Sequence, residues 1–248
     1  MQYINNKFYI EKKSVKSLAE KFNTPLYCYS FKNLKTNIQN FKKTFKSISP
    51  LICFSVKSNS NVYLLKEIKK LGLGADVVSK GELFASLKAG INKNKIVFSG
   101  VGKTKEEIEY AIKKNILLIN SESLSEVLKI EEIAKKENKL VNIGLRLNPD
   151  TDAKTLKQIS TGKSENKFGV DEKTFIKIIN LMKKSKFIRI KCLSVHIGSQ
   201  ILNHKPYEKM LRVLDKLLKK LKYKFDIIDL GGGMGINYEK NNKKLNYN

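Results

Sequence analysis

Short apolar runs and longer amphipathic segments alternate along almost the whole chain, and this alternation constrains the fold more than any other feature. The apolar runs have the length of strands, and the segments between them repeat their apolar residues with the period of a helix. Such an alternation is typical of βα units and predicts a parallel sheet. The predicted strands span residues 51–56, 75–78, 96–99, 116–120, 141–147, 190–197 and 225–230, and the predicted helices 62–71, 80–89, 105–114, 123–136, 172–183 and 207–221.

Seven consecutive βα units favour an α/β fold of the TIM-barrel type in which seven of the eight strands are present. A complete barrel of this type takes about 250 residues, and the chain has 248. A doubly wound open sheet remains the alternative from the pattern alone. Before the first of these strands, residues 14–22 and 31–45 have a helical pattern and residues 26–29 a strand-like one. We therefore expect an N-terminal helix and strand segment (1–30), an incomplete barrel (31–238) and a polar tail that frays (239–248).

Polar residues and glycine recur at or just after the ends of the predicted strands. In a parallel barrel these strand ends share one rim, which is where active sites of this fold form. Two of the following helices also begin with the spacing of a capping box, Ser79 before Glu82 and Thr104 before Glu107. The residues expected on the rim are Lys57, Ser79, Ser99, Ser121, Arg146, His196 and Gly231.

Lys57 follows the apolar segment FSV at the end of the first barrel strand. Apolar neighbours that remove water from an amine lower its pKa and prepare it to attack a carbonyl group. A surface lysine is the alternative, because lysines are abundant in this chain.

Gly231, Gly232 and Gly233 follow the last predicted strand, where their backbone amides can surround an anion such as phosphate. The segment lacks the GxGxxG spacing and the lysine and serine of a Walker motif. A purely steric need for glycine at this turn is the alternative.

His196 ends the sixth predicted strand and is either a catalytic residue or a buried histidine with satisfied hydrogen bonds. Asp76, Glu82 and Arg146 are either polar groups of the site or simply caps and ion pairs. His204 lies in a polar segment and is interpreted as a surface residue. The three cysteines, Cys28, Cys53 and Cys192, are far apart and lack CxxC spacing, so they indicate neither disulfides nor a metal site and fit a reducing cytoplasm.

The formal charge of +26 arises from 49 basic and 23 acidic residues. A charge of this size raises the possibility of a nucleic-acid partner. Only three of the basic residues are arginines, however, whereas readers of phosphates and bases favour the planar arginine fork. We therefore interpret the excess as a solvated lysine surface and expect no specific nucleic-acid binding. The sequence has no apolar run of about 18 residues and no signal peptide, so no membrane association is expected.

Five segments together carry a specific signal: FSVKSNSN (54–61), GLGADVVSKGELFASLKAG (72–90), NPDTDAKTLKQISTGKSENKFG (148–169), SVHIGSQI (194–201) and DLGGGMGINY (229–238). In order and spacing they resemble diaminopimelate decarboxylase. The resemblance implies a pyridoxal 5′-phosphate (PLP) enzyme with an alanine-racemase-like barrel and a C-terminal β-domain, a homodimer that converts meso-2,6-diaminopimelate to L-lysine and carbon dioxide. The third segment ends in Lys167-Phe168-Gly169, which favours this branch over the related ornithine and arginine decarboxylases.

Carried over position by position, the resemblance implies that Lys57 binds PLP covalently and that His196 stacks on the pyridine ring. It assigns the phosphate to Ser199, Gly231, Gly232 and Gly233, and it places Asp76, Glu82 and Arg146 around the reacting centre, with no metal.

The family's eighth strand carries a Glu-Pro-Gly-Arg segment, and nothing after Tyr238 resembles it. No cysteine follows Cys192, so the family's later Cys-Glu-Ser-Gly-Asp segment has no counterpart either. We therefore expect the front two-thirds of a decarboxylase, whether from a truncated reading frame, a partial gene or a deliberate cut. A single-domain PLP carrier without turnover is the alternative, because some barrels of this superfamily lack the β-domain.

Overall fold

The computed structural model describes residues 2–153, 161–162 and 168–236. The chain divides into two compact units, Met1–Leu51 and Ile52–Asn248. Residues 31–45, which the sequence pattern assigned to the barrel, fall in the first of these units. The polar tail predicted to fray, 239–248, lies outside the described residues.

The first unit contains a small antiparallel sheet that the sequence analysis did not predict. Asn5 and Asn6 connect its first two strands with positive φ angles of 47° and 59°, as a two-residue hairpin turn requires. The stretch 26–29, predicted to be a strand, is not one: no strand pairs with it among the described residues, and Leu26, Tyr27 and Tyr29 are exposed. The elements of this unit are β1 (Gln2–Ile4), β2 (Lys7–Ile10), β3 (Lys13–Ser14), α1 (Val15–Phe22) and α2 (Phe31–Thr44).

The second unit is built on a seven-stranded parallel sheet, as the alternation predicts. Its strands follow one another in the order β10-β9-β8-β7-β6-β5-β4. Each predicted strand and helix has its counterpart here. The strands are β4 (Cys53–Ser55), β5 (Gly74–Val77), β6 (Ile96–Phe98), β7 (Leu118–Ser121), β8 (Val141–Leu147), β9 (Ile188–Val195) and β10 (Ile227–Asp229), and the main helices α3 (Val62–Lys70), α4 (Lys80–Lys88), α5 (Lys105–Lys114), α6 (Leu124–Lys136), α7 (Glu172–Met182) and α8 (Lys205–Lys220).

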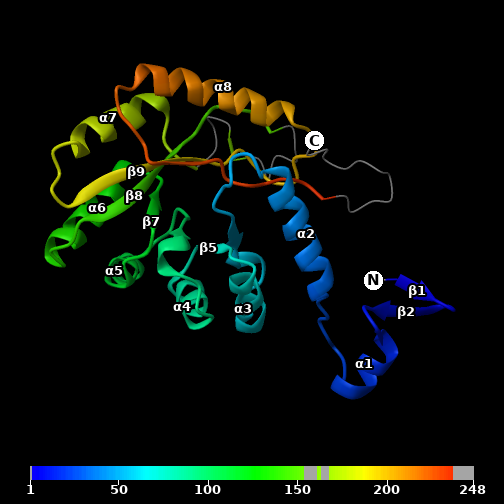
Figure 1. The fold of residues 1–248 in the computed structure, drawn as a ribbon. Helices are drawn as coiled ribbons and strands as arrows, with labels where there is room; N and C mark the ends of the chain where they lie inside the picture. The colour runs from blue at the N-terminus through cyan, green and yellow to red at the C-terminus, as the bar shows by residue number, and fades with distance from the viewer. Residues whose placement is uncertain (1, 154–160, 163–167, 237–248) are drawn as a thin grey trace. The chain divides into compact units, whose positions relative to one another are not determined.

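This sheet is a curved, incomplete barrel and not the doubly wound alternative. The strand order never reverses, whereas a doubly wound sheet reverses at its switch point. The Asn120 amide on β7 also donates a hydrogen bond of 3.1 Å to Asp229 on β10. In a flat sheet these two strands would stand about 14 Å apart, three strand spacings. The sheet must therefore curve until its inner face closes on itself, and Figure 1 shows α3 to α8 following one another around the outside of that arc.

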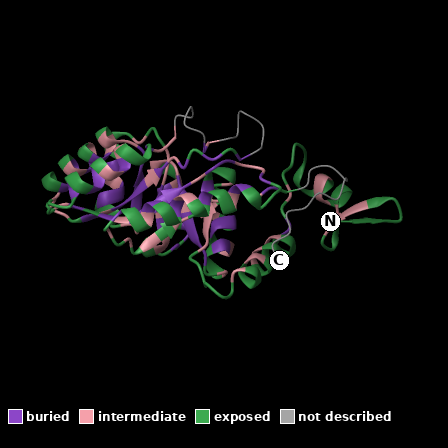
Figure 2. Cartoon of the chain, turned by 90° about the horizontal axis from the view of Figure 1, so that it is seen from above, coloured by how far each residue is buried: buried purple, intermediate pink, exposed green. Residues whose placement is uncertain are grey.

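The core lies between the strands and the inner faces of the helices (Figure 2). Each of the helices α3 to α8 contributes buried apolar side chains, each worth about 1.5–3 kcal/mol when removed from water. This two-layer packing fixes the strands and, with them, the residues at their ends. The core side chains from the helices include Leu65, Ile68, Leu83, Ile108, Ile130, Phe175 and Ile178.

The starts of three helices connect this core to the loops above it. Thr104 and Glu107 form the predicted reciprocal capping box. The predicted box at Ser79 is only half formed: its hydroxyl accepts from the Glu82 amide, but the Glu82 carboxylate accepts from Val78, one residue before the cap. Glu126 repeats this arrangement after β7, where its carboxylate accepts from the amide of Glu122. In α4 and α6, the glutamate of the first turn thus fixes the loop between strand and helix as well as the start of the helix.

Candidate functional site

The predicted rim is confirmed, because polar residues gather at the carboxyl ends of the parallel strands. All seven strands of this sheet run parallel, so residues that end consecutive strands lie at one end of the sheet. The structure places there Lys57 in the short 3-10 helix η1 (Val56–Ser58), Asp76 on β5, Ser79 and Ser99 just after β5 and β6, Ser121 on β7, Arg146 on β8, His196 after β9 and Gly231 after β10.

Lys57 is exposed, so the prediction that apolar neighbours remove its water is wrong. The strand ends at Ser55, and the 3-10 turn carries Lys57 beyond the layer of apolar side chains. Bonds within the turn, from the Ser58 hydroxyl to the Ser55 carbonyl (2.8 Å) and from the Asn59 amide to the Val56 carbonyl (2.9 Å), fix this position. The charge of Lys57 lowers the pKa of both Asp76 and His196. All three residues therefore share one electrostatic environment.

Asp76 is a carboxyl group that burial keeps partly protonated near neutral pH. Loss of water raises its pKa to about 6, and the negative charge of Asp229 acts in the same direction. A hydrogen bond of 2.6 Å from the Ser99 hydroxyl and the charge of Lys57 oppose that rise. Asp76 can thus hold or release a proton in the physiological range.

Asn120 connects Asp76 to the far side of the barrel, and sequence reasoning missed it. Its amide nitrogen donates to the Ser99 hydroxyl at 3.3 Å and to the Asp229 carboxylate at 3.1 Å. The Ser194 hydroxyl donates to the same oxygen of Asp229 at 2.9 Å. The result is a chain of hydrogen bonds across the inner face of the sheet from β5 to β10. A polar residue inside a predicted apolar strand was the available signal.

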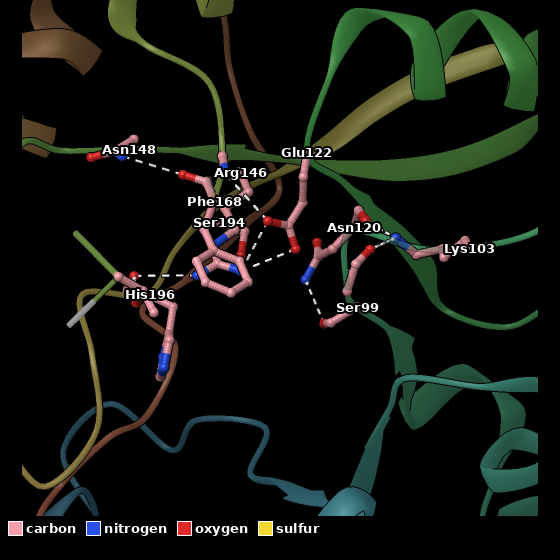
Figure 3. A network of polar contacts seen from close by, with 12 residues as sticks. Ser99, Lys103, Asn120, Glu122, Arg146, Asn148, Phe168, Ser194 and His196 are labelled. Atoms are coloured by element: carbon pink, nitrogen blue, oxygen red, sulfur yellow. Dashed lines mark hydrogen bonds and ion pairs between the residues drawn. The ribbon is translucent and has the colours of Figure 1, made fainter. Parts of the chain in front are cut away.

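Arg146 is held by Glu122, which sequence reasoning also missed (Figure 3). One guanidinium nitrogen lies 3.0 and 3.1 Å from the two carboxylate oxygens, and the side chains are only 12% and 3% exposed. The other nitrogen donates to the carbonyl of His196 at 3.4 Å, and the ring of Phe168 lies 5.0 Å from the guanidinium carbon. For Arg146 the ion-pair interpretation therefore holds, and the pair supports the segment that carries His196.

His196 is neutral at physiological pH. Burial, reinforced by the positive charges of Arg146 and Lys57, lowers its pKa to about 4. Its Nδ1 accepts a hydrogen bond of 3.3 Å from the amide of Gly232, so the proton of the neutral ring lies on Nε2. His204, by contrast, is 68% exposed and lies 3.4 Å from Glu208, which confirms it as a surface residue.

The three glycines after β10 are not equivalent. Gly231 and Gly233 have φ angles of +69° and +84°, and a Cβ on either would overlap a backbone carbonyl, that of Val195 or that of Gly198. Both are therefore sterically required. A Cβ on Gly232 would meet nothing within 4 Å, so this residue faces open space. The loop is fixed around it by a bond of 2.9 Å from the Tyr207 hydroxyl to the Gly232 carbonyl.

Of the remaining predicted site residues, Ser199 lies beside the glycine loop and Glu82 lies in the first turn of α4. Ser199 borders the glycine loop, since its Cα would lie 3.4 Å from a Cβ on Gly233. The Glu82 carboxylate instead accepts from the amide of Val78, so its visible contact is a cap, although its charge reaches Asp76 and raises that pKa. The structure thus associates Lys57 with Asp76 and His196, and His196 with the glycine loop.

Two kinds of feature are absent from the described ranges. No helix there is both long and apolar enough to cross a membrane. Within the same ranges, no three histidine, cysteine, aspartate or glutamate residues lie where they could hold a metal ion together.

Comparison with known proteins gives consistent matches. The family described as "Pyridoxal-dependent decarboxylase, pyridoxal binding domain" matches residues 31–248. Diaminopimelate decarboxylase of Campylobacter jejuni is 44% identical over 91% of the chain and 57% of its own length, and that of Aquifex aeolicus is 41% identical over 98% and 58%. The crystal structure of the Helicobacter pylori enzyme complexed with L-lysine superposes with a TM-score of 0.89 at 42% identity, over 94% of this chain and 59% of that one. The chain thus spans somewhat under three fifths of these relatives.

Proposed function

The chain belongs to the family of pyridoxal-dependent decarboxylases, and on this premise we propose that it is the PLP-binding part of a diaminopimelate decarboxylase. The observation that carries the proposal is the opening at Gly232. This glycine faces free space between two sterically required glycines, next to a neutral histidine. In the proposal the cofactor lies at the carboxyl ends of the strands, with Lys57 as its covalent partner.

The residues present fit PLP. A phosphate needs backbone amides without side chains in front of them, and Gly232 leaves that space free, with Ser199 beside the loop. A pyridine ring needs a flat neighbour, and the uncharged imidazole of His196 provides one without adding a cation next to Lys57 and Arg146. In this role Gly231 and Gly233 shape the loop, while Gly232 makes room for the phosphate.

When bound, PLP supplies an electron sink for the electron pair that remains after carbon dioxide departs. The exposed amine of Lys57 is accessible both to the cofactor and to a substrate amine that replaces it. Asp76, with a pKa of about 6, lies within electrostatic reach of Lys57 and holds or releases a proton as the lysine changes charge. Glu122 compensates the charge of Arg146 and fixes its guanidinium against the His196 carbonyl, which orients the imidazole.

The substrate proposed is meso-2,6-diaminopimelate, with L-lysine and carbon dioxide as products. It rests on the names of the relatives and on the lysine bound in the Helicobacter pylori structure. A homodimer and a cytoplasmic location belong to the same proposal, by analogy with the family.

The decisive experiment traps the cofactor. The chain is incubated with PLP, reduced with borohydride and digested, and the labelled peptides are identified by mass spectrometry. We expect the label on Lys57, its loss in Lys57→Ala, and its retention in the control Lys66→Ala, which removes another exposed lysine a few residues away. Equal labelling of many lysines, unchanged by Lys57→Ala, would contradict the proposal. Carbon dioxide release from meso-diaminopimelate, compared with L-ornithine, then tests the substrate.

A further inference from the structure

We propose that Asn120 is a positioning residue that fixes the glycine loop (residues 231–233) through Asp229, and that residue 144 is glycine to make room for the Asn120 amide. The inference rests on the proposed function, since the loop is there the phosphate site. It concerns Asn120 on β7 and Gly144 on β8, neither of which is among the expected cofactor contacts.

Asn120 is a buried polar residue whose amide nitrogen makes two hydrogen bonds, to Ser99 on one side and to Asp229 on the other. Its amide oxygen is buried without a hydrogen-bond partner in the described structure. A buried acceptor left unpaired is unfavourable. The orientation of this amide is therefore set by the two hydrogen bonds that its nitrogen donates. Of these, the bond to Asp229 joins strands that are farther apart in the sheet, β7 and β10.

Asp229 passes this restraint on to the loop, because its two oxygens have different partners. Oδ2 accepts from Asn120 and from Ser194, that is, from β7 and β9. Oδ1 accepts from the amide of Gly231 at 2.9 Å. The carboxylate thus joins the interior of the barrel to the first residue of the loop. With Gly231 fixed, the amide of Gly232 is directed to Nδ1 of His196, and the open face of Gly232 is held in place.

Gly144 on the neighbouring strand β8 has the complementary feature. A Cβ there would overlap the amide oxygen of Asn120 and come within 3.3 Å of Leu118. The φ angle of Gly144 is not positive, so backbone conformation does not require glycine at this position. The space that a side chain would fill is the space that the Asn120 amide occupies.

The experiment compares two ligands that differ only in the phosphate, PLP and pyridoxal, by titration of the chain and of its variants. In Asn120→Ala we expect the affinity for PLP to fall about tenfold, the usual loss for a hydrogen bond to a charged group, while the affinity for pyridoxal changes less than about twofold. A general loss of structure would weaken both ligands alike. The matched control Asn142→Ala makes the same change on β8, toward the opposite end of that strand, and should leave both affinities unchanged.

Ser194→Ala keeps the proposal testable should Asn120→Ala fold poorly, since it removes the other donor to the same oxygen of Asp229. This variant should also lower the affinity for PLP relative to pyridoxal, but by a smaller factor than Asn120→Ala. If the unmodified chain prefers PLP to pyridoxal and both variants keep that preference in full, the inference is overturned and the proposed function stands. If the unmodified chain shows no such preference, the phosphate site itself is wrong and both fall.

A suppressor test addresses Gly144 separately. Gly144→Ala alone should lower the thermal unfolding midpoint strongly, and Asn120→Ala in the same chain should restore most of it, because the new methyl group then fills the vacated space. The double variant should still show the weakened preference for PLP. An equal loss of stability from Gly144→Ala in both backgrounds would overturn the assignment.

Discussion

Two lysines at the same end of the sheet have opposite environments. Lys103, between β6 and α5, is 1% exposed and donates to Glu126 at 2.6 Å and to the carbonyls of Gly100 and Asn120 at 2.6 and 2.7 Å. Lys57, after β4, is exposed and has no hydrogen-bond partner within the described ranges. The first lysine uses its charge to join loops together. The second leaves its amine free for chemistry.

The same contrast extends to the two sides of the rim. On the side of β6 to β8, two buried ion pairs join charges of opposite sign: Lys103 with Glu126, and Arg146 with Glu122. On the side of β9, β10 and β4, the corresponding groups are a neutral histidine, an open glycine and an exposed lysine. Buried ion pairs contribute little net stability but are costly to break. The paired side is therefore a rigid frame, and the unpaired side is where a ligand can compete for contacts.

Breaking the frame should have the largest effect. Lys103→Met leaves the Glu126 carboxylate, only 12% exposed, without its counter-charge, and should lower the free energy of unfolding by about 3–5 kcal/mol. Chemical denaturation measures this loss. The control Lys80→Met removes a lysine whose ion pair with Glu106 is exposed and screened by water, and should cost far less. Similar losses in both variants would mean that burial of the pair does not matter.

The glycine loop offers the next largest effect. Gly233→Ala forces a Cβ against the carbonyl of Gly198 in a left-handed backbone conformation, and should destabilise the chain by about 2–3 kcal/mol. Gly232→Ala meets free space and should change stability by less than about 0.5 kcal/mol, yet weaken PLP binding. Unfolding curves measured with and without PLP separate the two outcomes. A Gly232→Ala variant that binds PLP normally would argue against a phosphate at that face.

The sheet and its helices could be predicted because their signals are local. Apolar runs, helical periods and N-cap residues each occupy a few adjacent positions, and the elements followed them closely. The N-terminal hairpin had a local signal too, because the Asn5-Asn6 pair lies between short alternating segments, but no strands were predicted there. The stretch 26–29 had suitable residues but no strand to pair with, and pairing is not a local property.

In the site, too, local features could be predicted and contacts between distant segments could not. Strand-end positions placed Lys57, Asp76, Arg146 and His196 on one rim. What each does depends on contacts between distant segments: Glu122 reaches Arg146 across neighbouring strands, and Asn120 reaches Asp229 only because the sheet curves. The exposure of Lys57 depends on where β4 gives way to a 3-10 turn.

The opposite pKa shifts of His196 and Asp76 predict opposite pH dependences. The pKa of His196 is lowered from 6.5 to about 4 in the folded chain, so the unfolded chain binds the proton first and stability falls as pH falls through that window. The pKa of Asp76 is raised from 3.8 to about 6, so stability falls as pH rises through that window. In urea denaturation between pH 4 and 6.5, His196→Gln should gain stability relative to the unmodified chain toward low pH, and Asp76→Asn toward high pH, each by about 2–3 kcal/mol. Parallel curves would refute the shifts.

The smallest effect on stability should come from Lys57 itself, although its effect on the neighbouring groups is specific. Lys57→Ala removes an exposed side chain without a visible partner, so the free energy of unfolding should change by less than about 0.5 kcal/mol. Its positive charge lowers the pKa of both His196 and Asp76, so its removal should raise both. For His196 that is a return toward the ordinary value, and for Asp76 a move further from it. NMR titration of the two side chains measures both shifts, with Lys66→Ala as the control for a lysine outside the rim. If His196 and Asp76 titrate identically with and without Lys57, the lysine does not share their environment. Lys57 would then not belong to the open side of the rim, where the proposed chemistry takes place.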